Sequence, residues 1–466
     1  MATDNDILEL TKDSFAKIVN FAKLEPEDNK LAMATIAAFR NVKDRTSTND
    51  DVRKIRLQLN KIFYLVYKKC FLSCMELAST DRGIPVLLRM FFNFGFMDEV
   101  LAGPENTVFI YKLASMLQED PNGHVYLYYD WLKAIYDGKK MPSVNEMSLD
   151  YEGQLRELKR SGKIDDEGIK RMMTNSVKKV EFEIDNAFKS MSRVVSGTVT
   201  TFCPIFCDNQ LFKPMDATII SYKAIYEQLQ KIRSVDFSCF YRETLYTNPD
   251  IGVERAFVQK EVIPDVILMP NVGQRGLMWQ DIEGKKRTTR GRFALPFFMN
   301  DDVEKAMVRM CAEFRWELCK RIQGARWNDM SDPSLTAEYC DYVETFKKNR
   351  ELSSEQREKL KAIYIKCKKN SKEMFVLDYA DYYMHEAKGS LRLNKVSRNI
   401  LFKYCPFAKQ YRESASKNAM YTDIVNRYGI KKMHEIKLSD AMINRIEGKG
   451  ALIPPEIKVH RKYLES

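Results

Sequence analysis

The stretch Pro264-Asp-Val-Ile-Leu-Met-Pro270 decides the class of fold, because it is a short apolar run flanked by two prolines. Proline cannot donate to a β ladder, so a run of this length between prolines is typical of a buried strand. Turn residues follow, then Leu277-Met-Trp-Gln-Asp-Ile282 and, beyond Glu283-Gly284, the run Arg287–Phe293. Short runs separated by turns predict an antiparallel three-strand meander in the middle of the chain.

Farther from this stretch in both directions, the sequence has fewer features of strands, and apolar residues recur with the spacing of a helix. The β-branched segment Gly197-Thr-Val-Thr-Thr-Phe-Cys203 predicts one more strand. Further toward the N-terminus, Cys70 and Cys74 continue an apolar stripe that recurs every three or four residues, which is one face of a helix. The fold class that follows is mostly α with a central α+β unit. It has a helical N-terminal domain, an antiparallel meander in the middle and a helical, basic C-terminal domain.

The boundaries of these domains follow from composition. The segment Asp137-Gly-Lys-Lys-Met-Pro-Ser-Val-Asn145 combines Gly, Pro, Ser and Asn and is typical of a linker. A chain of 466 residues has room for two to four domains at about 150 residues each. We predict a helical domain at 1–136, a central α+β domain at 146–330 and a basic helical domain at 331–466.

Local signals divide the C-terminal domain into helices. Ser353-Ser-Glu-Gln356 has the form of a capping box and predicts the start of a helix. Gly389 is expected to separate two helices, Met374–Ala387 and Leu391–Tyr404. A helix that begins near Asn418 is expected to stop at Gly429, and residues 448–455 are expected to form an extended arm.

Composition excludes several classes of protein. Hydrophobic residues make up 45% of the chain and charged residues 30%, so the chain as a whole is not disordered. Ten cysteines in 466 residues are too few for a disulfide scaffold, and they are expected to be reduced. No apolar run reaches the 18 or so residues of a membrane span, and no secretory signal is visible at the start. We therefore expect a cytoplasmic protein without a membrane span.

The net charge of +11 is concentrated in the last quarter of the chain. Residues 341–466 contain 27 Lys and Arg against 16 Asp and Glu, and residues 1–340 contain 48 of each kind. Such asymmetry indicates an anionic partner, although a solvated Lys-rich surface produces the same pattern.

The strongest candidate site is the basic and aromatic segment 388–417. A helix through Lys395 and Arg398 would place both side chains opposite an apolar stripe that includes Val396 and Ile400. A cationic face of this kind can neutralise phosphates or meet an acidic protein surface. The candidate partner-binding residues are Lys388, Arg392, Lys395, Arg398 and Lys403.

A second candidate contact is the loop Gly284-Lys-Lys-Arg-Thr-Thr-Arg-Gly-Arg292. Arginine binds phosphate and carboxylate in a bidentate manner, so Arg287, Arg290 and Arg292 are expected to contact an anion from an exposed hairpin loop. The phosphate-binding loop pattern G-x-x-x-x-G-K-[ST] does not occur in the chain.

Asp378, Asp381 and His385 fall on one helix face and form the best candidate for a metal site. The H-E-x-x-H pattern is absent and no second cluster supplies further ligands, so we predict no metal and no cofactor. No catalytic residues can be assigned, because the G-x-S-x-G motif is also absent and only four histidines are available as bases.

These observations favour a cytosolic, non-enzymatic interaction or scaffold protein that docks an anionic partner through its basic C-terminal quarter. One alternative is a nucleic-acid-binding protein that uses the same cations together with stacking rings. Those rings would be Phe402, Tyr404, Phe407 and Tyr411. The other alternative is an enzyme whose site is not visible as a sequence motif.

Overall fold

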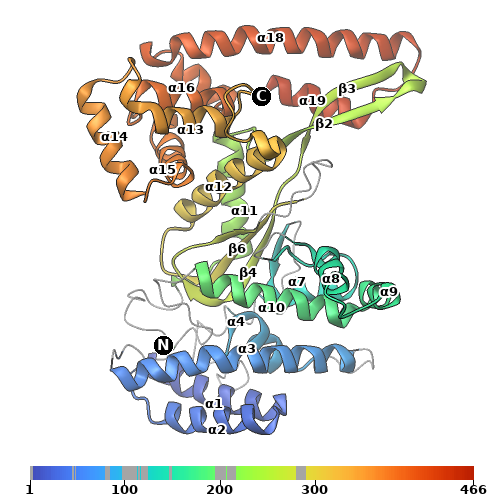
Figure 1. Cartoon of the computed structure of the whole chain (residues 1–466), viewed down its shortest axis with the longest axis vertical. Helices are drawn as coiled ribbons and strands as arrows, with labels where there is room; N and C mark the ends of the chain where they lie inside the picture. The colour runs from blue at the N-terminus through green and yellow to red at the C-terminus, as the bar shows by residue number, and fades with distance from the viewer. Residues whose placement is uncertain are drawn as a thin grey trace. The chain divides into compact units, whose positions relative to one another are not determined.

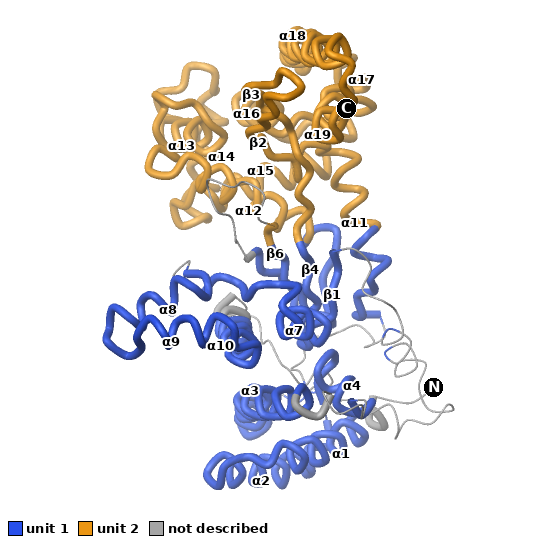
Figure 2. The backbone as a smooth tube through the Cα atoms, turned by 90° about the vertical axis from the view of Figure 1, so that its right-hand side faces the viewer, with its two compact units in different colours: residues 1–226, 265–281, 292–306 blue, residues 227–264, 282–291, 307–466 orange. Residues whose placement is uncertain are grey.

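The computed structural model describes residues 4–44, 47, 49–78, 84–96, 113, 116, 124–145, 149–194, 206, 217–279 and 290–466. Its contacts divide the chain into two compact units (Figure 2). Unit 1 comprises residues 1–226, 265–281 and 292–306, and unit 2 comprises residues 227–264, 282–291 and 307–466. The units therefore interleave along the chain. The three domains expected from composition remain a prediction at their stated boundaries.

Unit 1 is a set of helices around a small mixed sheet (Figure 1). Its helices are α1 (Asp4–Ala22), α2 (Pro26–Arg40), α3 (Asp50–Ala78), α4 (Val86–Phe94), α7 (Tyr128–Tyr136), α8 (Tyr151–Arg160), α9 (Asp166–Thr174) and α10 (Ser176–Val194). The predicted stripe on α3 is confirmed, because Cys70 and Cys74 are buried as free thiols.

The sheet of unit 1 has the strand order β1-β4-β6-β5. These strands are β1 (Val125–Leu127), β4 (Asp265–Gly273), β5 (Leu277–Trp279) and β6 (Arg292–Met299). β4 pairs in parallel with both β1 and β6, and only β5 runs antiparallel to its neighbour. Every residue of β4 and β6 is buried, as is typical of parallel strands covered on both faces.

The predicted central α+β unit is confirmed, but the antiparallel meander is wrong. A meander requires each strand to pair with the next one along the chain, whereas β4 pairs with β6 and leaves β5 at the edge. The predicted strand at 197–203 lies outside the described residues.

Unit 2 combines one β hairpin with a helical array. The hairpin consists of β2 (Tyr241–Asn248) and β3 (Val253–Glu261). The helices are α13 (Leu335–Thr345), α14 (Ser354–Lys366), α15 (Ser371–Met384), α16 (Lys395–Tyr404), α17 (Lys409–Ala415), α18 (Ala419–Gly448) and α19 (Pro455–Glu465). The boundaries between the units fall inside α11 (Tyr222–Val235) and α12 (Val303–Gln323).

Local sequence signals explain most helix ends in unit 2. Ser353 and Gln356 form the predicted capping box at the start of α14. Gly389 adopts a left-handed conformation with a φ of 85° after α15 and its following turn, as expected for a glycine that ends a helix.

One prediction around α18 is wrong, and another is correct only in part. The helix does not stop at Gly429 but continues to Gly448, because one glycine costs a helix only about 1 kcal/mol and the residues after it are helix formers. The expected arm at 448–455 is short and leads directly into α19, whose first turn begins at Pro455.

α18 is held at both ends by apolar packing. Near its N-terminus, the Tyr421 and Tyr428 rings each lie 5.8 Å from the Phe402 ring of α16. Near its C-terminus, Ile446 packs with Val253 of β3 and Ile457 of α19 in one buried cluster. The middle of the helix therefore spans the distance between α16 and the hairpin, as Figure 1 shows for this unit.

None of the helices among the described residues is both long enough and apolar enough to cross a membrane.

Candidate functional site

The predicted partner-binding residues on the segment 388–417 do not form one cationic face. Lys388, Arg392 and Lys395 are exposed, and the Lys395 ammonium lies 3.2 Å from a carboxylate oxygen of Glu351. Lys403 is also exposed and forms an ion pair with Glu338.

Arg398 is buried, with 3% of its surface exposed, which corrects the expectation that it faces solvent. Its Nε donates to Glu386 Oε2 over 2.7 Å, and its Nη2 donates to the Leu393 carbonyl oxygen over 2.7 Å. The Tyr421 hydroxyl donates to the same carboxylate over 2.6 Å. Burial alone would raise the pKa of Glu386, but the hydrogen bonds from Arg398 and Tyr421 lower it overall. Arg398 therefore neutralises a buried carboxylate rather than an external ligand.

The rings proposed for stacking on this segment are mostly part of the core. Phe402 and Phe407 are buried, and the Phe407 ring stacks on that of Tyr382 with centroids 4.2 Å apart. Tyr404 is half-buried and donates its hydroxyl to Glu338 over 2.7 Å, and Tyr411 is also half-buried.

The predicted basic loop after β5 lies mostly outside the described residues. Arg287 lies outside the described residues, and Arg290 is exposed. Arg292 belongs to β6 and is buried, so the expectation that it projects from an exposed loop is wrong. Its guanidinium donates to Ser143 Oγ and to the Met141 carbonyl oxygen, each over 2.8 Å. Because β6 is covered on both faces, its first residue has to satisfy its charge inside unit 1.

The helix face with Asp378, Asp381 and His385 does not assemble a metal site. Asp378 is half-buried and accepts a hydrogen bond from the Tyr339 hydroxyl over 2.7 Å, and desolvation raises its pKa to about 7. His385 Nε2 lies 3.8 Å from Asp381 Oδ1. Within the described part of the chain, no three His, Cys, Asp or Glu side chains are placed to hold a metal ion.

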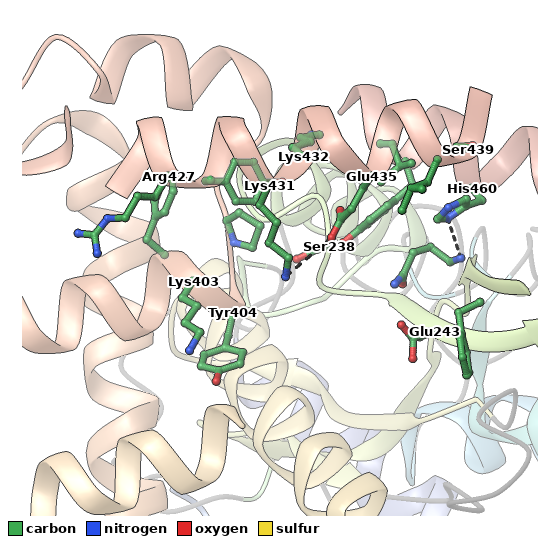
Figure 3. A pocket seen from close by; sticks show the side chains of 18 of the residues that line it. Ser238, Glu243, Lys403, Tyr404, Arg427, Lys431, Lys432, Glu435, Ser439 and His460 are labelled. Atoms are coloured by element: carbon green, nitrogen blue, oxygen red, sulfur yellow. Dashed lines mark hydrogen bonds and ion pairs between the residues drawn. The ribbon is translucent and has the colours of Figure 1, made fainter. Parts of the chain in front are cut away.

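Unit 2 contains a cavity of about 860 Å³, which we call the α18 cavity. Its wall is built from the β2–β3 hairpin, α16, the middle of α18 and α19 (Figure 3). The charged residues on the wall are Glu243, Arg255, Lys403, Arg427, Lys431, Lys432 and Glu435. Five cations against two carboxylates give the cavity a positive character.

The middle of α18 supplies most of these cations. Lys431 is exposed, and its ammonium lies 3.8 Å from Glu435 one turn along the helix. In Figure 3, α18 with Lys431 lies on one side of the cavity, and α16 with Lys403 and Tyr404 lies on the other. At this separation the Lys431–Glu435 pair is weak, so Lys431 keeps its capacity to bind an anion.

Lys432 lies deeper in the wall than its neighbour. Its Nζ is buried and has no hydrogen-bond partner among the described residues. It lies 5.1 Å from the Phe237 ring centroid and 5.4 Å from that of Tyr428. Burial and the nearby Arg412 guanidinium lower the pKa of Lys432 to about 7. An anion in the cavity would stabilise its charged form.

The hairpin contributes an exposed apolar surface to the cavity. Phe257 on β3 pairs directly across the ladder with Leu245 on β2. Phe257 is 50% exposed and Leu245 is 56% exposed, but only Phe257 lines the cavity. The Arg255 guanidinium lies over the Phe257 ring at 5.2 Å from the centroid.

α19 closes the outer edge of β3. The backbone N–H of Gln259 donates to His460 Nδ1 over 3.1 Å, so the proton of the neutral imidazole is on Nε2. Burial lowers the pKa of His460 and favours this neutral form. Ser439 of α18 also lines the cavity, and its buried Oγ has no hydrogen-bond partner among the described residues.

Among the residues of this wall, sequence reasoning named Lys403 as a partner-binding cation and Phe402 and Tyr404 as stacking rings. Lys431 and Lys432 were missed because α18 was expected to end at Gly429, before both of them. The available signal was the charge excess after residue 341, which continues through this part of α18.

Comparison with known proteins gives one match. Residues 324–463 match the model of a family described as a domain of unknown function (DUF8509). No curated protein and no solved structure matches the chain. The matched segment includes α16 and α18 and most of α19, and therefore includes most of the residues that line the α18 cavity.

Proposed function

We propose that the protein is a non-enzymatic interaction or scaffold protein of the cytosol that docks an anionic partner in the α18 cavity of unit 2. The observation that carries this proposal is the presence of five cations on one cavity wall, contributed by the separate elements β3, α16 and α18. The charge excess of the last quarter of the chain supports it independently.

The environment of these cations favours an external ligand. Arg255, Arg427 and Lys431 are exposed residues on the cavity wall, so binding does not require breaking a buried ion pair. Charged groups in a concave site also act together, because the low-dielectric walls concentrate their field in the cavity. We therefore expect the cavity, rather than the scattered cations of the segment 388–417, to be the docking site.

The test is titration of the full chain with two defined polyanions, polyphosphate and polyglutamate, at low and moderate salt. Replacing the exposed Lys431 by Glu places a negative charge on the cavity wall, and binding of any anion there is expected to weaken at least fivefold. Lys437→Glu is the matched control, because Lys437 is exposed on the same helix and does not line the cavity.

Equal weakening by the two substitutions would mean that binding follows net charge and not the cavity, and would contradict the proposal. Native-like binding by Lys431→Glu would contradict it as well. Arg427→Glu gives a second variant on the cavity wall, with the same expected direction as Lys431→Glu.

A further inference from the structure

The ring of Phe257 is half-exposed and lines the α18 cavity. Val253 of the same strand is instead buried in the cluster with Ile446 of α18 and Ile457 of α19. Most exposed positions on a strand carry polar residues, because one face of an antiparallel ribbon is solvated. An aromatic ring at such a position, on the wall of a cavity, suggests that its face serves a ligand.

Cations lie over this ring and elsewhere on the same cavity wall. Arg255 lies over the ring from the same strand, and Lys431 and Arg427 line the same cavity from α18. A flat aromatic ligand can stack on a phenyl ring, and a phosphate attached to that ligand can bind ammonium and guanidinium groups. The wall thus combines the two kinds of contact that a nucleotide makes with single-strand-binding proteins.

Two buried polar groups in the wall provide unused hydrogen-bonding capacity. Ser439 is 3% exposed, and its Oγ has no hydrogen-bond partner among the described residues. The buried Nζ of Lys432 also has no hydrogen-bond partner among these residues. Buried polar groups are normally satisfied, so these two groups can offer hydrogen bonds to a polar ligand in the cavity. The cavity volume of about 860 Å³ falls within the usual range of about 300–1,000 Å³ for small-molecule sites.

We propose that the α18 cavity binds a nucleoside phosphate, with the base stacked on Phe257 and the phosphate groups of the free nucleotide or of the strand bound by exposed cations of the wall, which are Arg255, Arg427 and Lys431. This inference rests on the proposed function and names the chemical class of its anion. A nucleoside phosphate uses both the cations and the exposed ring, and an acidic protein surface is an alternative outcome of the test. The same chemistry is offered by a free nucleotide and by a nucleotide within a single strand.

The experiment measures binding of the full chain to four probes at fixed salt. These are a labelled oligothymidylate of about twelve nucleotides, an abasic strand of equal charge, free adenosine monophosphate and polyglutamate. The oligothymidylate is expected to bind about tenfold more tightly than the abasic strand, because only the former can stack.

Substitutions at the ring test the stacking contact directly. Phe257→Ala is expected to weaken oligothymidylate binding about tenfold and to leave abasic-strand binding within about twofold. Phe257→Trp retains a ring and is expected to restore binding, whereas Phe257→Leu keeps an apolar side chain and is not. Leu245→Ala is the matched control, because it removes an equally exposed apolar partner on the neighbouring strand that does not line the cavity.

The outcomes separate the two sources and the two proposals. Free nucleotide that competes with the strand and loses affinity in Phe257→Ala identifies a nucleotide site, and strand binding without competition identifies a single-strand site. If Lys431→Glu weakens binding of every probe while Phe257→Ala weakens binding of none, the proposal of a nucleoside phosphate is overturned. The proposal of an anionic partner then remains, with a partner of another class such as an acidic protein. If no probe depends on the cavity cations, both proposals fail.

Discussion

At the scale of single residues, Lys432 carries the most unusual environment of the α18 cavity. Its ammonium shares the Phe237 and Tyr428 rings with the Arg412 guanidinium, which lies 5.6 Å and 5.0 Å from the same two ring centroids. Cation–π contacts compensate only part of the cost of removing an ammonium from water. The folded state therefore lowers the pKa of this amine to about 7.

We expect the substitution Lys432→Met to stabilise the protein in a pH-dependent manner. Below pH 7 the amine is charged in the folded and unfolded states, and the folded state bears the full cost of burying the charge. Between pH 7 and about 10 the folded state holds the neutral amine, and the cost falls as the pH rises. Methionine removes this cost, so the free energy of unfolding should rise by about 1–2 kcal/mol at pH 6, a figure reduced for partial solvent screening.

Denaturant unfolding of Lys432→Met at pH 6 and pH 9 measures this effect, and the gain should shrink at the higher pH. Lys437→Met, at an exposed position of the same helix, should change the stability little at either pH. A gain at Lys432 that is independent of pH would show that better apolar packing, and not a buried charge, is responsible.

At the scale of elements, prediction from sequence succeeded where the signal is local. The Ser353 capping box and the left-handed Gly389 each involve a few neighbouring residues, and both are present. The parallel pairing of β4 with β6 and the burial of Arg398 against Glu386 and Tyr421 depend on contacts between distant segments. Hydrophobic periodicity carries no information about such partners, so Arg398 was assigned to the wrong environment.

The α18 cavity also depends on contacts between segments that are distant in the sequence. Phe257 and Lys431 are separated by more than 150 residues and reach one wall only because Val253, Ile446 and Ile457 join the hairpin to α18 and α19. The charge excess predicted that the last quarter of the chain would be basic. The charge excess could not predict which of these cations line the α18 cavity.

Two glycines of unit 2 give opposite predictions that test the assignment of α18. Gly429 lies inside this helix with open space around its α-carbon, so Gly429→Ala should stabilise the protein by about 0.5–1 kcal/mol. Gly389 also has open space but has a φ of 85°, so Gly389→Ala should destabilise it by about 1 kcal/mol. The melting temperatures of both variants, compared with that of the unsubstituted protein, test this prediction. Destabilisation by Gly429→Ala would show that the helix breaks at this residue.

At the scale of the whole molecule, the charge distribution separates the two ends of the chain. The first 340 residues carry no net charge and the remainder carries +11. Partner binding that used the overall charge would involve cations throughout the basic region. Binding in the α18 cavity would use only a small number of cations. The salt dependence of the binding constant measures how many phosphates these cations neutralise.

For a single strand, the logarithm of the binding constant falls linearly with the logarithm of salt concentration, with a slope of about −0.7 for each phosphate neutralised. Three exposed cations on the wall, Arg255, Arg427 and Lys431, predict a slope of about −2 for an oligothymidylate. Lys431→Gln should reduce the magnitude of this slope by about 0.7. Lys54→Gln changes an exposed lysine of α3 in unit 1 and should leave the slope unchanged.

Equal reductions by the two substitutions would assign binding to the overall charge, because each variant loses one positive charge. A slope much steeper than about −2 would require more phosphate contacts than the cavity offers, and would extend the binding surface to the exposed Lys388, Arg392 and Lys395. The salt dependence thus distinguishes a cavity that holds one or two nucleotides from a basic surface along which a longer strand binds.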